Sequence, residues 1–189
     1  MRDVPAPVRL LVVCTANQCR SPLGEVIARA DLERRGVPAV VASAGFLAGG
    51  APAAEGSVLA ASRRGLDLRG HVSRRLEPGM VEEADVVLTM EGAHVMRLVG
   101  DWPDRTDHVL TVEGAAAAAR LGVPDAPLDG PALRAWAVAA QPRVLGRVLD
   151  TTDDVADPMR GPARAYRRTA DVLAERFTVL FDAWFGRPT

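Results

Sequence analysis

The sequence predicts a small α/β domain in which a doubly wound parallel sheet carries helices on both faces. Two observations point to this class. Short apolar runs typical of strands occupy residues 8–13, 40–43, 84–90 and 108–112, and stretches with helical spacing of apolar residues lie between them. Strands that alternate with helices pair in parallel through right-handed crossovers, so the helices cover both faces of the sheet. A chain of 189 residues can form one such domain with a sizeable core.

Each predicted helix has its own sequence signals. The first spans residues 21–35, and Gly36 is well placed to end it. The second spans residues 53–64 and is closed by Gly65, while a third runs over residues 91–99. The last helix covers residues 163–185. Its predicted buried stripe consists of large side chains: Tyr166, Val172, Leu173, Phe177, Leu180, Phe181 and Trp184.

Residues 114–152 are the least regular part of the sequence. An alanine run at 115–119 is followed by turns rich in proline and glycine at 124–131, and then by a helix over 132–149 that Pro142 interrupts. We expect a single domain over residues 1–189, with a helical insertion at about residues 114–152. A surface elaboration is favoured over a lid or a partner surface.

Composition excludes several classes of protein. The formal net charge is −1, and no basic cluster of the kind that binds nucleic acid is visible. No apolar run approaches the roughly 20 residues that cross a bilayer, and residues 1–5 are too polar for a secretory signal. The two cysteines, five positions apart, do not form a disulfide scaffold. We expect a cytoplasmic protein whose partners are neither nucleic acid nor membrane.

The turn between the first strand and the first helix carries the strongest chemical signal. A cysteine opens it, an arginine follows six positions later, and the residues between them are small or polar. Such a turn directs backbone N–H groups at one anion, while the arginine holds the anion bidentately. These residues are Cys14, Thr15, Ala16, Asn17, Gln18, Cys19 and Arg20. The arrangement suits a thiolate that attacks phosphorus.

Neighbouring residues favour a reactive Cys14. A free thiol has a pKa of about 8.5, which a helix N-terminus and a nearby cation lower. Ser21 is the predicted helix N-cap, and its hydroxyl is placed to donate to the thiolate. Pro22 suits a first helical turn, and Asn17 tolerates left-handed backbone. The alternative is a buried structural cysteine before an ordinary strand-to-helix turn.

At these residues the chain resembles the low-molecular-weight protein tyrosine phosphatases. The likeness covers about residues 8–112 and resumes near Asp157-Pro158. Its motifs are Cys14-Thr15-Ala16-Asn17-Gln18-Cys19-Arg20-Ser21-Pro22, Ser43-Ala44-Gly45, and Gly65-Leu66-Asp67-Leu68 with Gly70-His71 and Ser73-Arg74. Ala16 departs from the glycine of the family pattern. The resemblance implies a four-stranded parallel sheet and metal-independent hydrolysis of phosphotyrosine in proteins through a cysteinyl-phosphate.

A second group must protonate the leaving oxygen, and Asp157 is the best candidate. Pro158 biases it to an extended backbone that suits a fixed loop, although spacing alone leaves Asp150, Asp153 and Asp154 as rivals. The resemblance assigns the general acid to Asp157.

The remaining predicted roles concern phosphate binding and loop support. Cys14 is the predicted nucleophile. We expect the phosphoryl group to bind to the backbone amides of residues 15–20 and to the Arg20 guanidinium. The same donors are expected to bind inorganic phosphate or related oxyanions as product or inhibitor. The resemblance places Ser43 and His71 in supporting hydrogen bonds to this loop. No metal or cofactor is expected, because the three histidines lack ligand-like spacing.

The choice of substrate stays open. Gln18 is neither the bulky aliphatic residue common in tyrosine-directed members nor the threonine of phosphoarginine-directed relatives. Met159-Arg160 and Phe46-Leu47-Ala48 stand where tyrosine-directed members place aromatic residues, and Phe46 is as well suited to the core. The alternatives are a phosphoarginine phosphatase, a thiol-coupled arsenate reductase and a non-catalytic phospho-ligand module.

The role of Cys19 is equally open. It either forms a reversible disulfide with Cys14 or is a small buried apolar residue.

Overall fold

The computed structural model describes residues 6–123, 127–147 and 154–188. Four parallel strands form one sheet in the order β2-β1-β3-β4, which confirms the predicted fold class. The strands are β1 (Val8–Cys14), β2 (Ala39–Gly45), β3 (Val86–Thr89) and β4 (Val109–Thr111). In the register of the sheet, Cys14 pairs with Gly45, so the predicted phosphate loop leaves the sheet beside the end of β2.

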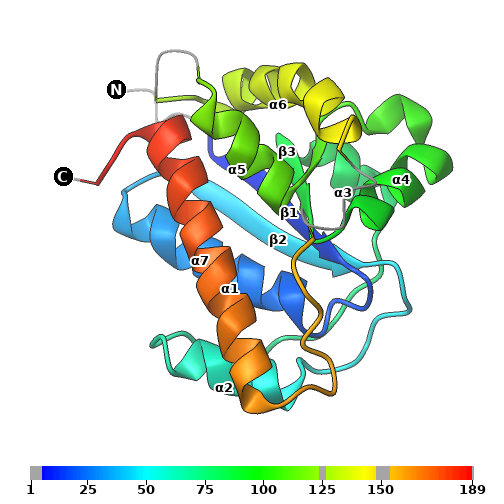
Figure 1. Ribbon diagram of the computed structural model, residues 1–189, viewed down its shortest axis with the longest axis vertical. Coiled ribbons are helices and arrows are strands. Elements are labelled where there is room, and N and C mark those ends of the chain that lie inside the picture. Colours follow the sequence, from blue (N-terminus) through cyan, green and yellow to red (C-terminus); the bar gives the residue numbers. More distant parts are fainter. Residues whose placement is uncertain (1–5, 124–126, 148–153, 189) are drawn as a thin grey trace.

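The helices divide between the two faces of the sheet (Figure 1). Leu10 and Val12 of β1 face one core together with α1 (Arg20–Arg34), α2 (Glu55–Ser62), α5 (Val112–Arg120), α6 (Gly130–Leu145) and α7 (Ala163–Phe185). Leu11 and Val13 face the other core with α3 (Pro78–Glu83) and α4 (Gly92–Asp101). A 3-10 turn, η1 (Pro103–Arg105), follows α4. The alternation along β1 fits a strand that is buried on both sides.

Packing confirms most of the predicted stripe of α7. All its members are buried except Val172, which is half-buried. Trp184 contacts Trp136 of α6 at 5.1 Å between ring centroids, edge to face. The described residues within 114–147 therefore supply core side chains, contrary to the expected surface elaboration. That this segment is an insertion stays a prediction.

Two helices were not predicted and a predicted interruption of a third was wrong, each for a local reason. Residues 78–83 form a helix of six residues that starts with Pro78, too short for a helical period to show in the sequence. The alanine run forms α5, whose N-cap Thr111 accepts from the Gly114 N–H at 2.9 Å. α6 runs through Pro142 to Leu145 without interruption, because a proline in the last turn removes only one helical hydrogen bond.

Among the described residues, no helix combines the length and the apolar character needed to span a bilayer.

Candidate active site

The phosphate loop lies between the end of β1 and the start of α1, at the carboxyl edge of the sheet. Cys14 is the last residue of β1 and is buried. Helix α1 begins at Arg20 with Cys19 as its N-cap, so the prediction of Ser21 as N-cap was wrong. Ser21 lies inside the first turn instead, and its Oγ lies 3.0 Å from the Cys14 Sγ. The hydroxyl of the first helical turn therefore lies within hydrogen-bonding distance of the sulfur.

Hydrogen bonds of Asn17 fix the shape of this loop. Its backbone has a φ of 53°, the left-handed conformation predicted for it. Its Nδ2 donates to Ser21 Oγ at 2.9 Å and to Ser43 Oγ at 2.8 Å, and its Oδ1 accepts from the Arg74 N–H at 2.9 Å. His71 Nε2 is hydrogen-bonded to the Asn17 carbonyl oxygen at 2.8 Å. Ser43 and His71 therefore contact the loop as the resemblance implies.

The end of β2 forms one wall of the loop. A Cβ added to Gly45 would lie 2.6 Å from the Asn17 nitrogen, so only glycine fits there. The N–H groups of Phe46 and Leu47 donate to the Thr15 carbonyl at 2.8 and 3.1 Å. Ala16 is not among the described residues with positive φ, which explains why alanine is tolerated at this position.

Donors remain unused in the loop. Within the described part of the chain, the backbone N–H groups of residues 15–19 make no hydrogen bond. The buried Nε of Arg20 also has no partner among those residues. Asn17, Cys19 and Arg20 are buried, and Thr15, Ala16 and Gln18 are partly buried. Polar groups withdrawn from water are almost always paired in folded proteins, so a cluster of unpaired donors in one turn indicates an anion site.

Arg20 connects the loop to two distant acids. Its side chain is 2% exposed, and its Nη2 lies 2.8 Å from Asp157 Oδ2. Its Nη1 pairs with Glu91 and donates to the Val155 carbonyl at 3.1 Å. Asp157 is 45% exposed, so its carboxyl lies between the buried guanidinium and solvent. This places the predicted general acid beside the phosphate loop.

The other aspartates considered as the general acid do not contact Arg20 in the described part of the structure. Asp154 Oδ1 accepts from the Gly92 N–H at 2.8 Å and so caps the first turn of α4. Asp150 and Asp153 lie outside the described residues.

Sequence reasoning missed two residues of this site, Glu91 and His94. His94 Nε2 is hydrogen-bonded to Thr15 Oγ1 at 3.0 Å and lies 3.7 Å from a Glu91 oxygen. Burial lowers the pKa of the His94 imidazole below its ordinary value. Glu91 comes two residues after β3, at the carboxyl edge where ligands bind in such sheets, and this position was the available signal.

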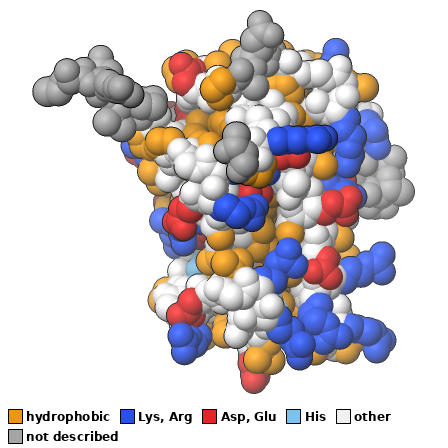
Figure 2. Space-filling model, turned by 90° about the vertical axis from the view of Figure 1, so that its left-hand side faces the viewer, with side chains coloured by type: hydrophobic (Ala, Val, Ile, Leu, Met, Phe, Trp, Pro, Cys, Tyr) orange, Lys and Arg blue, Asp and Glu red, His pale blue; other side chains and the backbone are white. Residues whose placement is uncertain are grey.

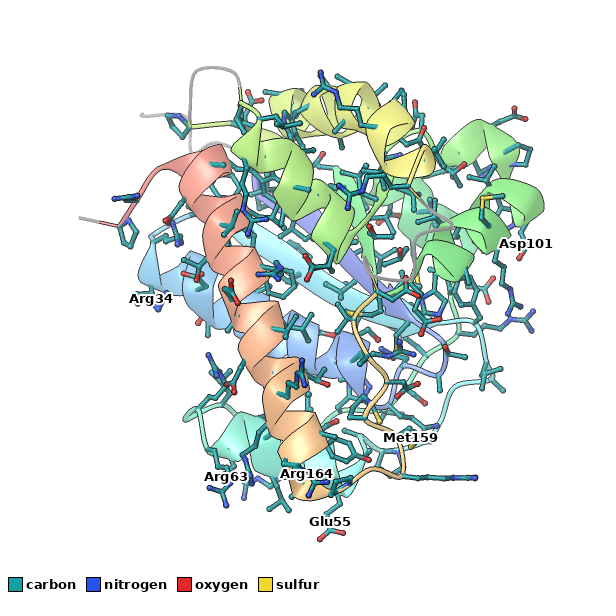
Figure 3. The ribbon with its side chains drawn as sticks, in the orientation of Figure 1. Arg34, Glu55, Arg63, Asp101, Met159 and Arg164 are labelled. Carbon is teal, nitrogen blue, oxygen red and sulfur yellow. The ribbon has the colours of Figure 1, made fainter. Side chains whose placement is uncertain are left out.

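Among the described residues, the apolar side chains at the rim of the site are aliphatic. Phe46 is buried against His94, with 5.4 Å between the ring centroids, so it belongs to the core side of the loop. Leu47 is half exposed, and Met159 projects from the segment that leads into α7 (Figure 3).

Cys19 lies under Met159, with 3.8 Å between the two sulfur atoms. Burial raises the pKa of its thiol to about 11, and both cysteines are free. No group of three or more His, Cys, Asp or Glu residues within the described ranges could hold a metal ion.

Comparison with known proteins identifies the family. The sequence profile described as "Low molecular weight phosphotyrosine protein phosphatase" matches residues 9–133. The chain belongs to this family. One relative, the probable low molecular weight protein-tyrosine-phosphatase AmsI of Erwinia amylovora, is 39% identical over 46% of this chain, and the match spans only 58% of that protein. The protein-arginine-phosphatase of Geobacillus stearothermophilus is 30% identical over 88% of this chain and 89% of its own length.

Solved structures of family members share the whole architecture. The crystal structure of a low molecular weight protein tyrosine phosphatase from T. tengcongensis matches with a TM-score of 0.71 and 28% identity. The match covers 93% of this chain and 98% of that one, so the fold extends well beyond the residues that the profile matches.

Proposed function

We propose that this phosphatase-family chain hydrolyses phosphotyrosine in proteins through a cysteinyl-phosphate intermediate, without a metal ion. The observation that carries the proposal is the group of unpaired donors in the turn that follows Cys14. The free N–H groups of residues 15–19 and the Arg20 Nε surround the turn that begins at Cys14. Such donors stabilise the charge on the equatorial oxygens of a phosphoryl group during transfer.

In the first step, the Cys14 thiolate attacks phosphorus in line with the leaving oxygen. The S–P bond forms while the P–O bond to the aryl group breaks, and the Asp157 carboxyl gives its proton to the departing oxygen. Ser21 Oγ, 3.0 Å from the sulfur, stabilises the thiolate before attack and when it leaves again.

In the second step, water attacks the cysteinyl-phosphate. Asp157, now a carboxylate, takes a proton from that water, the S–P bond breaks, and inorganic phosphate leaves with the Cys14 thiolate restored. Arg20 binds the phosphoryl oxygens in both steps. Because it also pairs with Asp157 and Glu91, a bound phosphate competes with these carboxylates for the guanidinium.

A second candidate substrate is phosphoarginine in proteins. It is favoured by the relative named protein-arginine-phosphatase, which aligns with 88% of this chain. The same loop would serve, and the leaving guanidinium would take the proton from Asp157. Phosphotyrosine remains the favoured substrate because several relatives carry the name protein-tyrosine-phosphatase.

We also infer that the protein acts in the cytoplasm on phosphorylated proteins. The mechanism requires a reduced Cys14, and thiols remain reduced in the cytosol.

The test is turnover by wild type and Cys14→Ser on an aryl phosphate, a phosphotyrosyl peptide, a phosphoarginyl peptide and, with a thiol reductant, arsenate. Wild type is expected to hydrolyse the first two substrates. Cys14→Ser is expected to lose at least about 10³-fold in kcat and still bind inorganic phosphate, since the loop donors are unchanged. Unchanged hydrolysis by Cys14→Ser would overturn the mechanism. A faster wild-type rate on phosphoarginine or arsenate than on the phosphotyrosyl peptide would overturn the assignment of phosphotyrosine as substrate.

A further inference from the structure

A groove lies directly beside the predicted general acid. Its volume is about 720 Å³, and its walls come from residues 154–158, residues 164–176 of α7 and Glu113 of α5. Helix α7 contributes Arg164, Arg168 and Arg176, which share one face because they are spaced by four and eight residues. The groove shares Asp157 with the candidate active site, so one extended ligand can reach both.

The acidic residues in the groove are already occupied. Glu113 forms an ion pair with Arg176 at 2.6 Å, and Asp157 forms one with Arg20. Asp154 caps α4 through the Gly92 N–H. These carboxylates therefore do not neutralise the remaining arginines of the groove.

Arg164 and Arg168 are left uncompensated. Both side chains are exposed, and neither makes a hydrogen bond or ion pair with any residue that the structure describes. Like charges four residues apart on a helix repel each other, so an anion bound between Arg164 and Arg168 reduces this repulsion. The groove thus presents two free guanidinium groups next to the phosphate loop.

Further arginines lie at the same end of α7. Figure 2 shows basic side chains, with acidic ones among them, on the lower part of the molecule, the end where α2 and the start of α7 lie in Figure 1. Arg164 is labelled at that end of α7 in Figure 3. Arg160 and Arg167 are also exposed there.

We propose that this groove docks an acidic segment of the phosphoprotein substrate, in which Asp or Glu residues flank the phosphorylated residue. The inference rests on the proposed function and specifies its substrate. Guanidinium groups bind carboxylates bidentately, which gives orientation as well as charge complementarity. An extended peptide advances about 3.3 Å per residue, so the groove would receive residues only a few positions from the one held at Cys14.

The test compares two phosphotyrosyl peptides of equal length, one with Asp and Glu in both flanks and the other with Asn and Gln in their place. Wild type is expected to prefer the acidic peptide roughly fivefold in kcat/KM, through KM, with the preference falling as salt is added. R164Q/R168Q is expected to lose this preference and to keep wild-type kcat/KM on the neutral peptide and on an aryl phosphate.

A matched control is R120Q/R143Q, which removes the same charge from exposed positions on α5 and α6 that do not line the groove. It is expected to keep the preference. The proposal is overturned if wild type does not distinguish the peptides, if R164Q/R168Q still does, or if the control loses the preference equally.

A binding measurement separates this inference from the proposed function. The acidic peptide without its phosphate is titrated into wild type and R164Q/R168Q, with fluorescence anisotropy as the readout. Weaker binding to the double variant supports docking, and equal binding overturns it, whether or not the protein turns over any phosphate ester. A single-stranded oligonucleotide that displaces the peptide at lower concentration would assign the groove to nucleic acid instead and overturn the proposal.

Discussion

Arg20 and Asp157, 137 positions apart in the chain, are joined by an ion pair of 2.8 Å between Nη2 and Oδ2. The guanidinium is almost fully buried, and it also holds the Val155 carbonyl two residues before the aspartate. One side chain therefore fixes both the phosphate loop, where it begins α1, and the segment that carries the predicted acid. Such fixed placement of an acid near the leaving oxygen is what proton transfer requires.

Asp157→Asn is expected to lower kcat by about 10²- to 10⁴-fold on a phosphate ester with a poor leaving group. An activated aryl phosphate needs little protonation of its leaving oxygen, so its turnover should change much less. Steady-state kinetics on a series of aryl phosphates of rising leaving-group pKa would show a steeper dependence in the variant than in wild type.

Asp154→Asn is the matched control for that experiment. Asparagine also caps helices well, so the bond to the Gly92 N–H can persist and stability should change by less than about 1 kcal/mol. Its turnover should follow that of wild type across the series. A leaving-group dependence in Asp154→Asn instead of Asp157→Asn would show that the acid is assigned to the wrong residue.

Asn17→Ala should damage both stability and activity. It removes three side-chain hydrogen bonds, two of them buried, and places alanine at a φ of 53°. Each lost bond costs about 1 kcal/mol and the backbone strain about 1 kcal/mol more, so the free energy of unfolding should fall by roughly 2–4 kcal/mol. Urea denaturation measures this change, and kcat/KM on an aryl phosphate should fall by at least tenfold as the loop loses its shape.

Asn17→Gly separates the two causes, because glycine adopts the left-handed conformation without strain but makes no side-chain bond. We expect it to be more stable than Asn17→Ala and equally impaired in kcat/KM. Full activity in Asn17→Gly would mean that the Asn17 side chain does not hold the loop in its working shape.

Local patterns were enough to predict the sheet and its long helices. The four apolar runs became the four strands, and α7 has the predicted bounds. The short helix α3 and the alanine-rich α5 were not predicted. Six residues cannot show a helical period, and an alanine run gives little contrast between an apolar and a polar helix face.

In the site, Cys14 and Arg20 share one turn and were visible in the sequence, whereas the contacts of Glu91 and His94 with that turn join residues 71 and 79 positions apart. No spacing rule reaches that far. Ser21 was misread for a related reason: its hydroxyl contacts Cys14 and Asn17 across the loop and leaves the helix end without a side-chain cap.

Gly45→Ala should distort the phosphate loop from outside. The added Cβ would meet the Asn17 nitrogen at 2.6 Å and the Ala16 carbonyl carbon at 2.8 Å, and these backbone atoms cannot rotate away. We expect a loss of about 1–3 kcal/mol in the free energy of unfolding and a lower kcat. Gly79→Ala in α3 is the control, since nothing lies within 4 Å of its Cβ and alanine favours a helix by up to about 1 kcal/mol. Equal behaviour of the two variants would contradict the close approach.

Cys19 should make stability fall at alkaline pH. Burial raises the pKa of its thiol from 9.0 to about 11, so the folded state keeps a proton that the unfolded state has lost. Below pH 9 the Cys19 thiol is protonated in both the folded and the unfolded state, and its stabilising contribution to the free energy of unfolding is fully present. As the pH rises from 9 through 11 this stabilising contribution is lost, because in this pH range the unfolded state binds fewer protons than the folded state. The shift corresponds to roughly 2–3 kcal/mol in the free energy of unfolding.

Cys19→Ala removes the thiol. Burial raises the pKa of Tyr166 in both proteins, and the neighbouring Cys19 raises it further in wild type only, so the substitution reduces both alkaline losses of stability. Urea denaturation at pH 8.5 and at pH 10.5 gives the change in unfolding free energy for each. Wild type should lose more stability than Cys19→Ala between the two values, since only wild type has the buried thiol to ionise. Parallel losses would mean that the Cys19 thiol ionises as readily in the folded state as in the unfolded chain, and that Met159 does not keep water from it.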